Sequence, residues 1–427
     1  MKRRLLIISP YFPPSNAADM QRVRMSLPYF KQFGWDAEVV AVDPHYTEIT
    51  KDGLLLQSVP AGIKIHLVKA LKKSWTSKFG LGSIALRSFF YYRKTVNSLL
   101  KTGRFDLVYF STTQFPVCIL GAYWKKRYGV PYVIDMQDPW HSEYYQDKPR
   151  DQRPKKYWFS YRLNKFLEPK AMNHVDGLIS VSDKYISDLK ERYTRIKNIP
   201  VETITFGAFE PDFEIARENS FRYDSILNPA TINLVYIGRG GHDMHKATEL
   251  LFNVFSQLLK TDASFSKIKI WFIGTSYAPP GEGVPTLLPL AEKFGIADHV
   301  IEITDRISYY HTLNTLQQAD ALFVPGSDDP KYTASKIFPY LLAKKPLLAI
   351  FNKESSAISI LHEYKAKDVY HFDDPKIQTF IESFLNNLLN KKLPTPEYDP
   401  AALEKYDAQN MTRSQCHVFE NVIELKK

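Results

Sequence analysis

A glycine-rich basic turn is the first stretch of the sequence that could hold a phosphorylated substrate. Gly238, Arg239, Gly240 and Gly241 follow a short apolar run, and Lys246 comes shortly after them. Glycines let backbone amides approach a ligand closely, and the two cations can neutralise a diphosphate. The spacing is neither that of a Walker loop nor that of the dinucleotide fingerprint. The sequence therefore predicts a diphosphate site here, with a tight turn carrying surface charges as the alternative.

A second candidate anion site lies further along the chain. A polar loop leads into a helix expected at 335–342, which begins near Thr333 or Ser335, and Lys336 follows at once. Free amides and the helix dipole attract anions, and the hydroxyls and the ammonium group would add to that attraction. An ordinary N-cap at Thr333 or Ser335 is the alternative, although a cap and a phosphate use the same amides.

The first half of the chain supplies polar side chains of a different kind. A loop after the apolar run 5–8 holds Asn16, Asp19, Gln21 and Arg22, which we expect to contact an acceptor. The alternative is a proline-stiffened loop in which Asp19 caps the following helix.

Another loop, after the apolar run 132–134, holds Asp138 and His141. We predict catalytic roles for both, although histidines more often serve as neutral packing or surface groups. A Ser–His–Asp triad is unsupported, because the sequence has no Gly-x-Ser-x-Gly elbow.

We expect neither a metal ion nor a cofactor. The adjacent carboxylates of Asp328 and Asp329 have no histidine or third carboxylate at ligand spacing, and oxygen-ligand sites need more donors than two. The charge of a phosphorylated substrate would then be neutralised by side chains and backbone amides.

Short apolar runs that alternate with helical patterns must position these loops. Such alternation predicts an α/β fold with parallel sheets covered on both faces, and ligands then bind at the carboxyl ends of the strands. The expected strands lie at 5–8, 37–42, 107–110, 132–134 and 177–181, and again at 232–237, 268–273, 299–303, 321–324 and 347–350. The expected helices include 21–33, 116–128, 244–259, 287–294, 309–318, 335–342 and 411–425.

The length of 427 residues exceeds that of one ordinary core and predicts two domains. We expect a Rossmann-like domain over 1–218, a polar linker over 219–229 and a second Rossmann-like domain over 230–400. Residues 401–427 should form a helix that packs back towards the first domain. The two domains would face each other across a ligand-binding cleft.

The net charge of +10 comes from one segment. Residues 64–104 contain ten Lys or Arg and no Asp or Glu, while the remainder of the chain is balanced. Confined charge without a nucleic-acid motif argues against a nucleic-acid-binding protein. Basic residues interleaved with Trp75, Phe79 and Leu81 favour an anionic membrane surface instead.

The alternative for this segment is an ordinary amphipathic helix packed on its sheet. An apolar stripe supports that reading, with Arg87, Lys94 and Lys101 expected to point away from it. The stripe consists of Ala85, Phe89, Tyr92, Val96 and Leu99.

Two cysteines, Cys118 and Cys416, cannot form a disulfide framework, which favours a reducing compartment. The apolar run near the start is too short for a signal peptide, and no run could span a membrane. We expect a cytoplasmic protein, with peripheral attachment to the inner face of a membrane.

Taken together, the motifs resemble the retaining, nucleotide-sugar-dependent glycosyltransferases of family 4, which have the GT-B fold. The resemblance runs nearly end to end. The matching motifs are residues 8–14, 138–140, Glu168 with 176–182, 203–209, Gly238-Arg239 with Lys246, and 336–341 with Lys345-Pro346.

Two departures from the family pattern stand out. Pro339 occupies the position of the second Glu of the motif that binds the donor ribose, and proline cannot accept a ribose hydrogen bond. The first Glu is not evident either, and Asp328 and Asp329 are the candidates for its place. The Gly-Gly of the opening loop is replaced by 16–18, which reads Asn-Ala-Ala.

The resemblance implies a metal-independent, hexosyl-type transferase of bacterial-type polysaccharide or glycoconjugate synthesis. Its partners would be a nucleotide-sugar donor, a glycan or lipid-linked acceptor and an anionic membrane, with no nucleic acid. A non-catalytic binding or scaffold relative and a sugar-nucleotide epimerase on the same fold are the alternatives.

Overall fold

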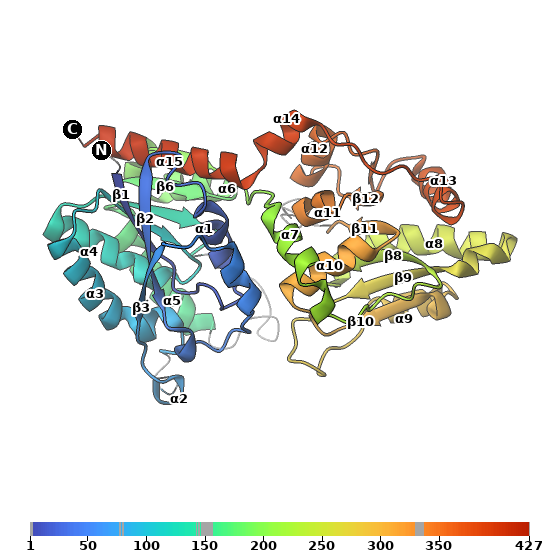
Figure 1. Cartoon of the computed structure of the whole chain (residues 1–427), viewed down its shortest axis with the longest axis horizontal. Helices are drawn as coiled ribbons and strands as arrows, with labels where there is room; N and C mark the ends of the chain where they lie inside the picture. Colours follow the sequence, from blue (N-terminus) through green and yellow to red (C-terminus); the bar gives the residue numbers. More distant parts are fainter. Residues whose placement is uncertain are drawn as a thin grey trace. The chain divides into compact units, whose positions relative to one another are not determined.

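The computed structural model describes residues 3–76, 78, 81–141, 143, 146, 157–328 and 337–426. The chain divides into two compact units, Met1–Gly207 with Tyr406–Lys427, and Ala208–Lys405. Each unit has its own parallel sheet covered by helices (Figure 1).

The first unit is built on a seven-stranded sheet in the order β3-β2-β1-β4-β5-β6-β7, in which every pairing is parallel. Strand order reverses beside β1, which is the position at which open α/β sheets commonly bind ligands. The strands are β1 Arg3–Ile8, β2 Trp35–Val42, β3 Lys64–Val68, β4 Leu107–Ser111, β5 Tyr132–Met136, β6 Gly177–Ser180 and β7 Val201–Thr203.

Helices cover both faces of this sheet. Successive side chains of a strand point to opposite faces, and β4 shows which helix lies on which face. The ring of Tyr109 lies 5.0 Å from Phe419 of the C-terminal helix α15, whereas Phe110 stacks on Trp124 of α4 at 5.9 Å. The helices are α1 Gln21–Ser26, α2 Lys73–Thr76, α3 Ile84–Thr102, α4 Ile119–Tyr128, α5 Tyr157–Met172, α6 Asp183–Arg192 and α15 Ala408–Glu424.

Two details of the first unit differ from the sequence prediction. The helix expected over 21–33 ends at Ser26, and turns continue to Gly34. Arg87, expected to point away from the apolar stripe of α3, is instead buried and donates hydrogen bonds to the carbonyl oxygens of Leu71 (2.9 Å) and Tyr46 (3.1 Å). Its charge therefore holds the segment before α3 and is not presented to solvent.

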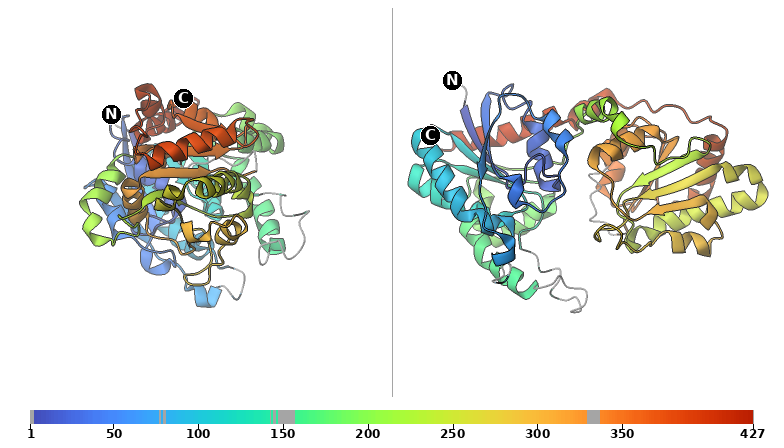
Figure 2. Two further views of the ribbon diagram at one scale, coloured as in Figure 1. Left: turned by 90° about the vertical axis from the view of Figure 1, so that its right-hand side faces the viewer. Right: turned by 60° about the horizontal axis from the view of Figure 1, so that its bottom comes forward.

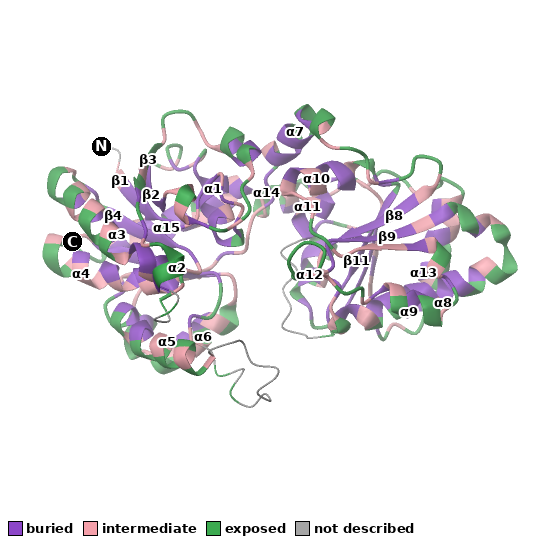
Figure 3. Cartoon of the chain, turned by 90° about the horizontal axis from the view of Figure 1, so that it is seen from below, coloured by how far each residue is buried: buried purple, intermediate pink, exposed green. Residues whose placement is uncertain are grey.

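The second unit has a six-stranded parallel sheet in the order β10-β9-β8-β11-β12-β13. Figure 2 gives two further views of both units, and Figure 3 shows that the strands are largely buried while the helices expose their outer sides. The strands are β8 Ile232–Ile237, β9 Ile268–Ile273, β10 Val300–Ile303, β11 Ala321–Pro325, β12 Leu347–Phe351 and β13 Asp368–His371. The helices are α7 Pro211–Glu218, α8 His245–Thr261, α9 Leu288–Lys293, α10 Tyr309–Gln318, α11 Ile337–Leu342, α12 Ser356–Glu363, α13 Ile377–Leu389 and α14 Pro400–Lys405.

The division between the units falls earlier than the sequence suggested. We expected the first domain to extend to residue 218, but α7 belongs to the second unit. The buried carboxylate of Asp212 explains this, since it accepts hydrogen bonds from the hydroxyls of Tyr309 (2.8 Å) and Tyr310 (3.1 Å) on α10. None of the described helices is both long enough and apolar enough to cross a membrane.

Candidate active site

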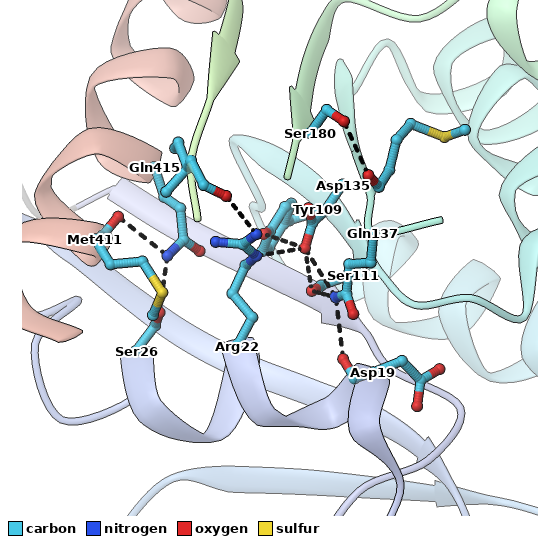
Figure 4. Close-up of polar contacts among 12 residues, drawn as sticks. Asp19, Arg22, Ser26, Tyr109, Ser111, Asp135, Gln137, Ser180, Met411 and Gln415 are labelled. Atoms are coloured by element: carbon cyan, nitrogen blue, oxygen red, sulfur yellow. Dashed lines mark hydrogen bonds and ion pairs between the residues drawn. The ribbon is translucent and has the colours of Figure 1, made fainter. Parts of the chain in front are cut away.

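The loops at the carboxyl edge of the first sheet are held by a buried ion pair. Arg22, on α1, places its Nε 2.8 Å from Oδ2 of Asp135 on β5, and both side chains are fully buried. The same guanidinium donates to the carbonyl oxygens of Ile204 (2.7 Å) and Thr205 (3.2 Å), beyond the end of β7. Figure 4 shows Arg22 between these elements.

Further donors contact one oxygen of the Asp135 carboxylate, whereas its Oδ1 is buried without a hydrogen-bond partner among the described residues. Ser111 Oγ (2.8 Å), Gln137 Nε2 (2.9 Å) and the Tyr109 hydroxyl (3.4 Å) donate to its Oδ2. A charge buried this deeply is stable only when it is paired and hydrogen-bonded. The arrangement positions loops and leaves Arg22 unavailable to an acceptor, in contrast to the role that the sequence suggested.

Asp19 is also a structural carboxylate. It is buried at the end of the first loop and accepts hydrogen bonds from Thr112 Oγ1 (2.9 Å) and from the backbone N–H of Thr113 (3.0 Å). Burial raises the pKa of Asp19 above its ordinary value, although these hydrogen bonds oppose the shift. Asp19 therefore ties the loop after β1 to the loop after β4.

The other two acceptor candidates remain nearer the surface. Asn16 is half-buried, and its backbone N–H donates to the carbonyl oxygen of Thr50 at 2.8 Å. Gln21 is also half-buried, but its Oε1 accepts from Arg24 Nε (2.9 Å). Of the four residues expected to contact an acceptor, the side chain of Asn16 is the one that the described contacts leave least engaged.

The loop after β5 holds Asp138 and His141 as the sequence predicted. Asp138 is exposed, and its pKa is raised by partial desolvation of the carboxyl group and by the charge of Asp19. The backbone N–H of His141 donates to Oε2 of the buried Glu168 (3.0 Å), which pairs with Arg192 at 2.8 Å through its other oxygen. The loop is thus anchored to α5 and α6.

The contacts of His141 also fix its protonation. Burial and the charges of Arg192 and Lys165 lower its pKa, so the ring is neutral at neutral pH. The Arg192 guanidinium lies 3.0 Å from Nδ1, and a guanidinium can only donate. Nδ1 therefore accepts, and the ring proton resides on Nε2, which is buried and has no hydrogen-bond partner in the described part of the chain. His141 is set up as a hydrogen-bond donor and not as a base.

In the second unit, the glycine-rich turn follows β8 directly. The N–H of Gly238 donates to the carbonyl oxygen of Ile273 and that of Gly240 to Thr275, both at 2.9 Å. A Cβ on Gly240 would lie 2.9 Å from the Cβ of Thr275. Glycine is required at this position because the turn packs directly against the end of β9.

Arg239 and Lys246 project from the same edge. Both terminal nitrogens of Arg239 donate to the Asp243 carboxylate at 2.6 Å, and the two side chains are 28% and 26% exposed. Burial alone would raise the pKa of Asp243, but hydrogen bonds from Arg239 and Ser327 outweigh it and lower the pKa. Lys246 lies 3.0 Å from the exposed Asp373. The partly exposed cations are within reach of an anion from solvent.

Two residues of this site were missed by sequence reasoning. Glu302, on β10, accepts the backbone N–H groups of Thr286, Leu287 and Leu288 and so holds the start of α9. The hydroxyl of the fully buried Tyr340 bridges the N–H (2.7 Å) and the carbonyl oxygen (3.0 Å) of Ile237 at the end of β8. An acidic residue within a strand was the one available signal for Glu302. Tyr340 looked like an ordinary apolar helix residue.

The second predicted anion site lies outside the described residues, since Thr333, Ser335 and Lys336 are not among them. Pro339 is the third residue of α11, and proline is tolerated in a first helical turn. The exposed Asp328 donates its backbone N–H to the carbonyl oxygen of Asp243 at 2.8 Å, which links this loop to the glycine-rich turn. Within the described ranges, no group of three His, Cys, Asp or Glu residues is placed to hold a metal ion.

Comparison with known proteins identifies the first unit. Residues 21–207 match the family described as "Glycosyl transferase 4-like domain", and the match ends where the first stretch of that unit ends. This segment is therefore similar to glycosyl transferase 4-like domains. No curated protein matched the sequence significantly.

Solved structures show that the two units together have the GT-B fold. Sucrose-phosphate synthase from Thermosynechococcus elongatus is 12% identical, with a TM-score of 0.58 over 99% of this chain and 100% of that one. Anabaena Alr3699/HepE in complex with UDP is 14% identical, with a TM-score of 0.56 over 98% and 100%. A UDP-forming trehalose-phosphate synthase from Burkholderia xenovorans, in complex with glucose-6-phosphate, is 11% identical, with a TM-score of 0.57 over 98% and 100%.

Proposed function

We propose that the protein is a retaining, metal-independent glycosyltransferase. It moves a hexosyl group from a nucleotide sugar to a glycan or lipid-linked acceptor at an anionic membrane, in bacterial-type polysaccharide or glycoconjugate synthesis. The family of the first unit supports glycosyl transfer. The UDP bound to HepE supports a uridine donor.

The observation that carries this proposal is the glycine-rich turn at the carboxyl end of β8. Gly238, Gly240 and Gly241 bring backbone close to a ligand, and Arg239 and Lys246 supply two cations beside it. Negative charge develops on the leaving diphosphate during transfer, and preorganised cations stabilise that charge. This arrangement supports transfer without a metal ion.

The first unit would supply the groups that contact the sugar and the acceptor. Asp138, which is exposed, would accept a hydroxyl proton or orient the acceptor. The neutral ring of His141, whose Nε2 is buried, would hold this catalytic loop in place. Since no described residue stands out as a nucleophile, retention would follow from front-face attack assisted by the departing phosphate. Asn16 would bind the acceptor, whereas Asp19, Gln21 and Arg22 would hold the surrounding loops.

The test compares wild-type protein with Arg239→Ala in transfer from UDP-glucose and other nucleotide sugars. Loss of one charged stabiliser should reduce kcat/KM by about 30-fold or more, corresponding to at least about 2 kcal/mol. Transfer should persist in EDTA, and NMR of the product should show the anomeric configuration of the donor. Unchanged transfer by Arg239→Ala would remove this residue from the mechanism.

Pro339 favours a second candidate, a non-catalytic relative. The donor ribose would lack the carboxylate partner that the family resemblance led us to expect at this position. Calorimetry with UDP and GDP sugars separates the candidates, because a scaffold should bind neither. Binding and turnover together would support the enzyme.

A further inference from the structure

The outer face of the helices α3, α4 and α5 is strongly basic. These three helices contain ten Lys or Arg residues and one acidic residue, Glu168. Glu168 is buried and already paired with Arg192, so it adds no negative charge to the surface. The neighbouring helix α6 is balanced, with three acidic and three basic residues. The charge is therefore concentrated on this layer of helices.

The fold brings these helices together. They pack side by side on one face of the sheet, with α4 between α3 and α5 (Figure 1). Their inner sides face the sheet, and eight of the ten cations are exposed: Arg93, Lys94, Lys101, Lys126, Arg127, Arg162, Lys165 and Lys170. Within the described ranges, none of the eight forms an ion pair with a carboxylate. We call these eight residues the basic face.

Two of the remaining charges near this face are already engaged. Lys125 pairs with Asp176 at 2.6 Å, and Arg87 is buried beneath α3. Among the residues that the structure describes just before α5, Glu143 is exposed and accepts a hydrogen bond from the Tyr161 hydroxyl at 3.4 Å. The face therefore presents a large excess of positive charge to any partner.

Exposed aromatic rings alternate with cations along α5. Trp158, Arg162, Phe166 and Lys170 follow one another at four-residue intervals, which places them on one side of the helix. Both rings are 64% exposed. The Arg162 guanidinium lies 5.7 Å from the centre of the Trp158 ring, and the Lys170 ammonium 4.3 Å from that of Phe166. On α3, Phe90 is also highly exposed, with 69% of its surface accessible.

This alternation distinguishes between the partners that a basic surface could bind. Nucleobases stack on the open faces of aromatic rings, but here a cation lies over one face of each ring of the α5 stripe. At a membrane both members of such a pair can bind lipid, because the ring enters the boundary between headgroups and acyl chains while the cation reaches the lipid phosphates. The pattern fits a lipid surface better than a nucleic acid.

We infer that the basic face, together with Trp158, Phe166 and Phe90, is the surface by which the protein docks on an anionic lipid bilayer. The inference deepens the proposed function and rests on it for the lipid-linked acceptor. It also changes the expected membrane-contacting surface, because the sequence predicted residues 64–104 alone and gave no signal for α5. Vesicle binding is measured without donor or acceptor and tests this inference. Donor binding is measured by calorimetry and tests the proposed function, so each hypothesis can fail without the other.

The experiment is flotation of the full-length protein with phosphatidylcholine vesicles, with and without phosphatidylglycerol. Wild-type protein should float with the anionic vesicles only, and less as salt is raised. The variant R162Q/K165Q/K170Q should partition about 100-fold more weakly, since each charge near an anionic surface contributes about fivefold. The variant W158S/F166S should also bind more weakly, although its charge is unchanged.

The matched control removes three exposed lysines from the second unit, as K260Q/K267Q/K293Q. It lowers the net charge equally and should bind vesicles like the wild type. Circular dichroism checks that each variant is folded. Absence of wild-type flotation at low salt, or equal losses in the two triple variants, would overturn the inference. Binding of an oligonucleotide that depends on the α5 cations, without vesicle binding, would assign the face to a nucleic acid instead.

Discussion

Replacing Arg22 with Met should destabilise the first unit far more than the loss of a surface charge would. The side chains of Arg22 and Asp135 are both fully buried, and their charged atoms lie 2.8 Å apart. Removing one partner of such a pair leaves an uncompensated buried charge and costs about 3–5 kcal/mol. The guanidinium also supplies the hydrogen bonds to the carbonyls of Ile204 and Thr205, so the cost should lie in the upper part of that range.

Urea denaturation followed by tryptophan fluorescence measures this loss. Five of the six tryptophans belong to the first unit, namely Trp35, Trp75, Trp124, Trp140 and Trp158. The signal therefore reports mainly on that unit even if the two units unfold separately. With an m-value of about 3 kcal/mol/M, a cost of about 4–5 kcal/mol should lower the midpoint by about 1.3–1.7 M.

The double variant R22M/D135N provides the control. Asparagine keeps an acceptor for Ser111 and Gln137 but removes the unpaired charge, so the double variant should be more stable than the sum of the two single losses predicts. A loss below about 1 kcal/mol for R22M, as is typical of exposed pairs, would refute the reasoning. Additive losses would refute it as well.

Three further predictions concern single groups. Burial raises the pKa of Asp19 above 3.8, so the folded state binds the carboxyl proton more tightly than the unfolded state. The stability contributed by this group therefore falls as pH rises from 3.8 through the folded pKa. Asp19→Asn should abolish this part of the pH profile in urea titrations, and an unchanged profile would contradict the prediction. Tyr340→Phe leaves the buried N–H at the end of β8 unpaired, and should cost about 1–3 kcal/mol in the second unit, measured by hydrogen exchange of β8. Gly240→Ala forces a Cβ against Thr275 and should weaken UDP-sugar binding in calorimetry, whereas Gly53→Ala, whose Cβ would meet nothing within 4 Å, should not.

Central strands were predictable from sequence, whereas three of the four edge strands, β3, β7 and β13, were not. The runs at 232–237 and 268–273 are apolar except for Asn233 and Lys269, because these strands are covered on both faces, and the structure gives the same bounds. The edge strand β3 alternates exposed and partly buried residues and contains Lys64 and His66, so it lacks the continuous apolar signal. β7 has only three residues, too few for any periodicity to show.

The same limit explains what the sequence could say about the candidate site. It placed the polar loops after β1, β5 and β8 correctly at the carboxyl ends of strands, because strand ends follow from hydrophobic patterning. It could not tell which charges are buried, since this depends on neighbours distant in the chain, such as the carbonyl of Ile204 beside Arg22. In the sequence alone, nothing distinguishes the buried charges of Asp19 and Arg22 from the exposed charge of Asp138.

Burial separates these charges into two functional kinds. The fully buried guanidinium of Arg22 already donates its hydrogen bonds to other loops. Moving it towards a substrate would leave Asp135 without its ion-pair partner, at a cost of several kcal/mol. The Arg239–Asp243 pair is partly exposed, and exchanging the carboxylate for a phosphate oxygen there replaces one anion with another. The chemistry should therefore depend on Arg239, Lys246 and the loop of Asp138 and His141, while the buried pair determines whether that loop keeps its place.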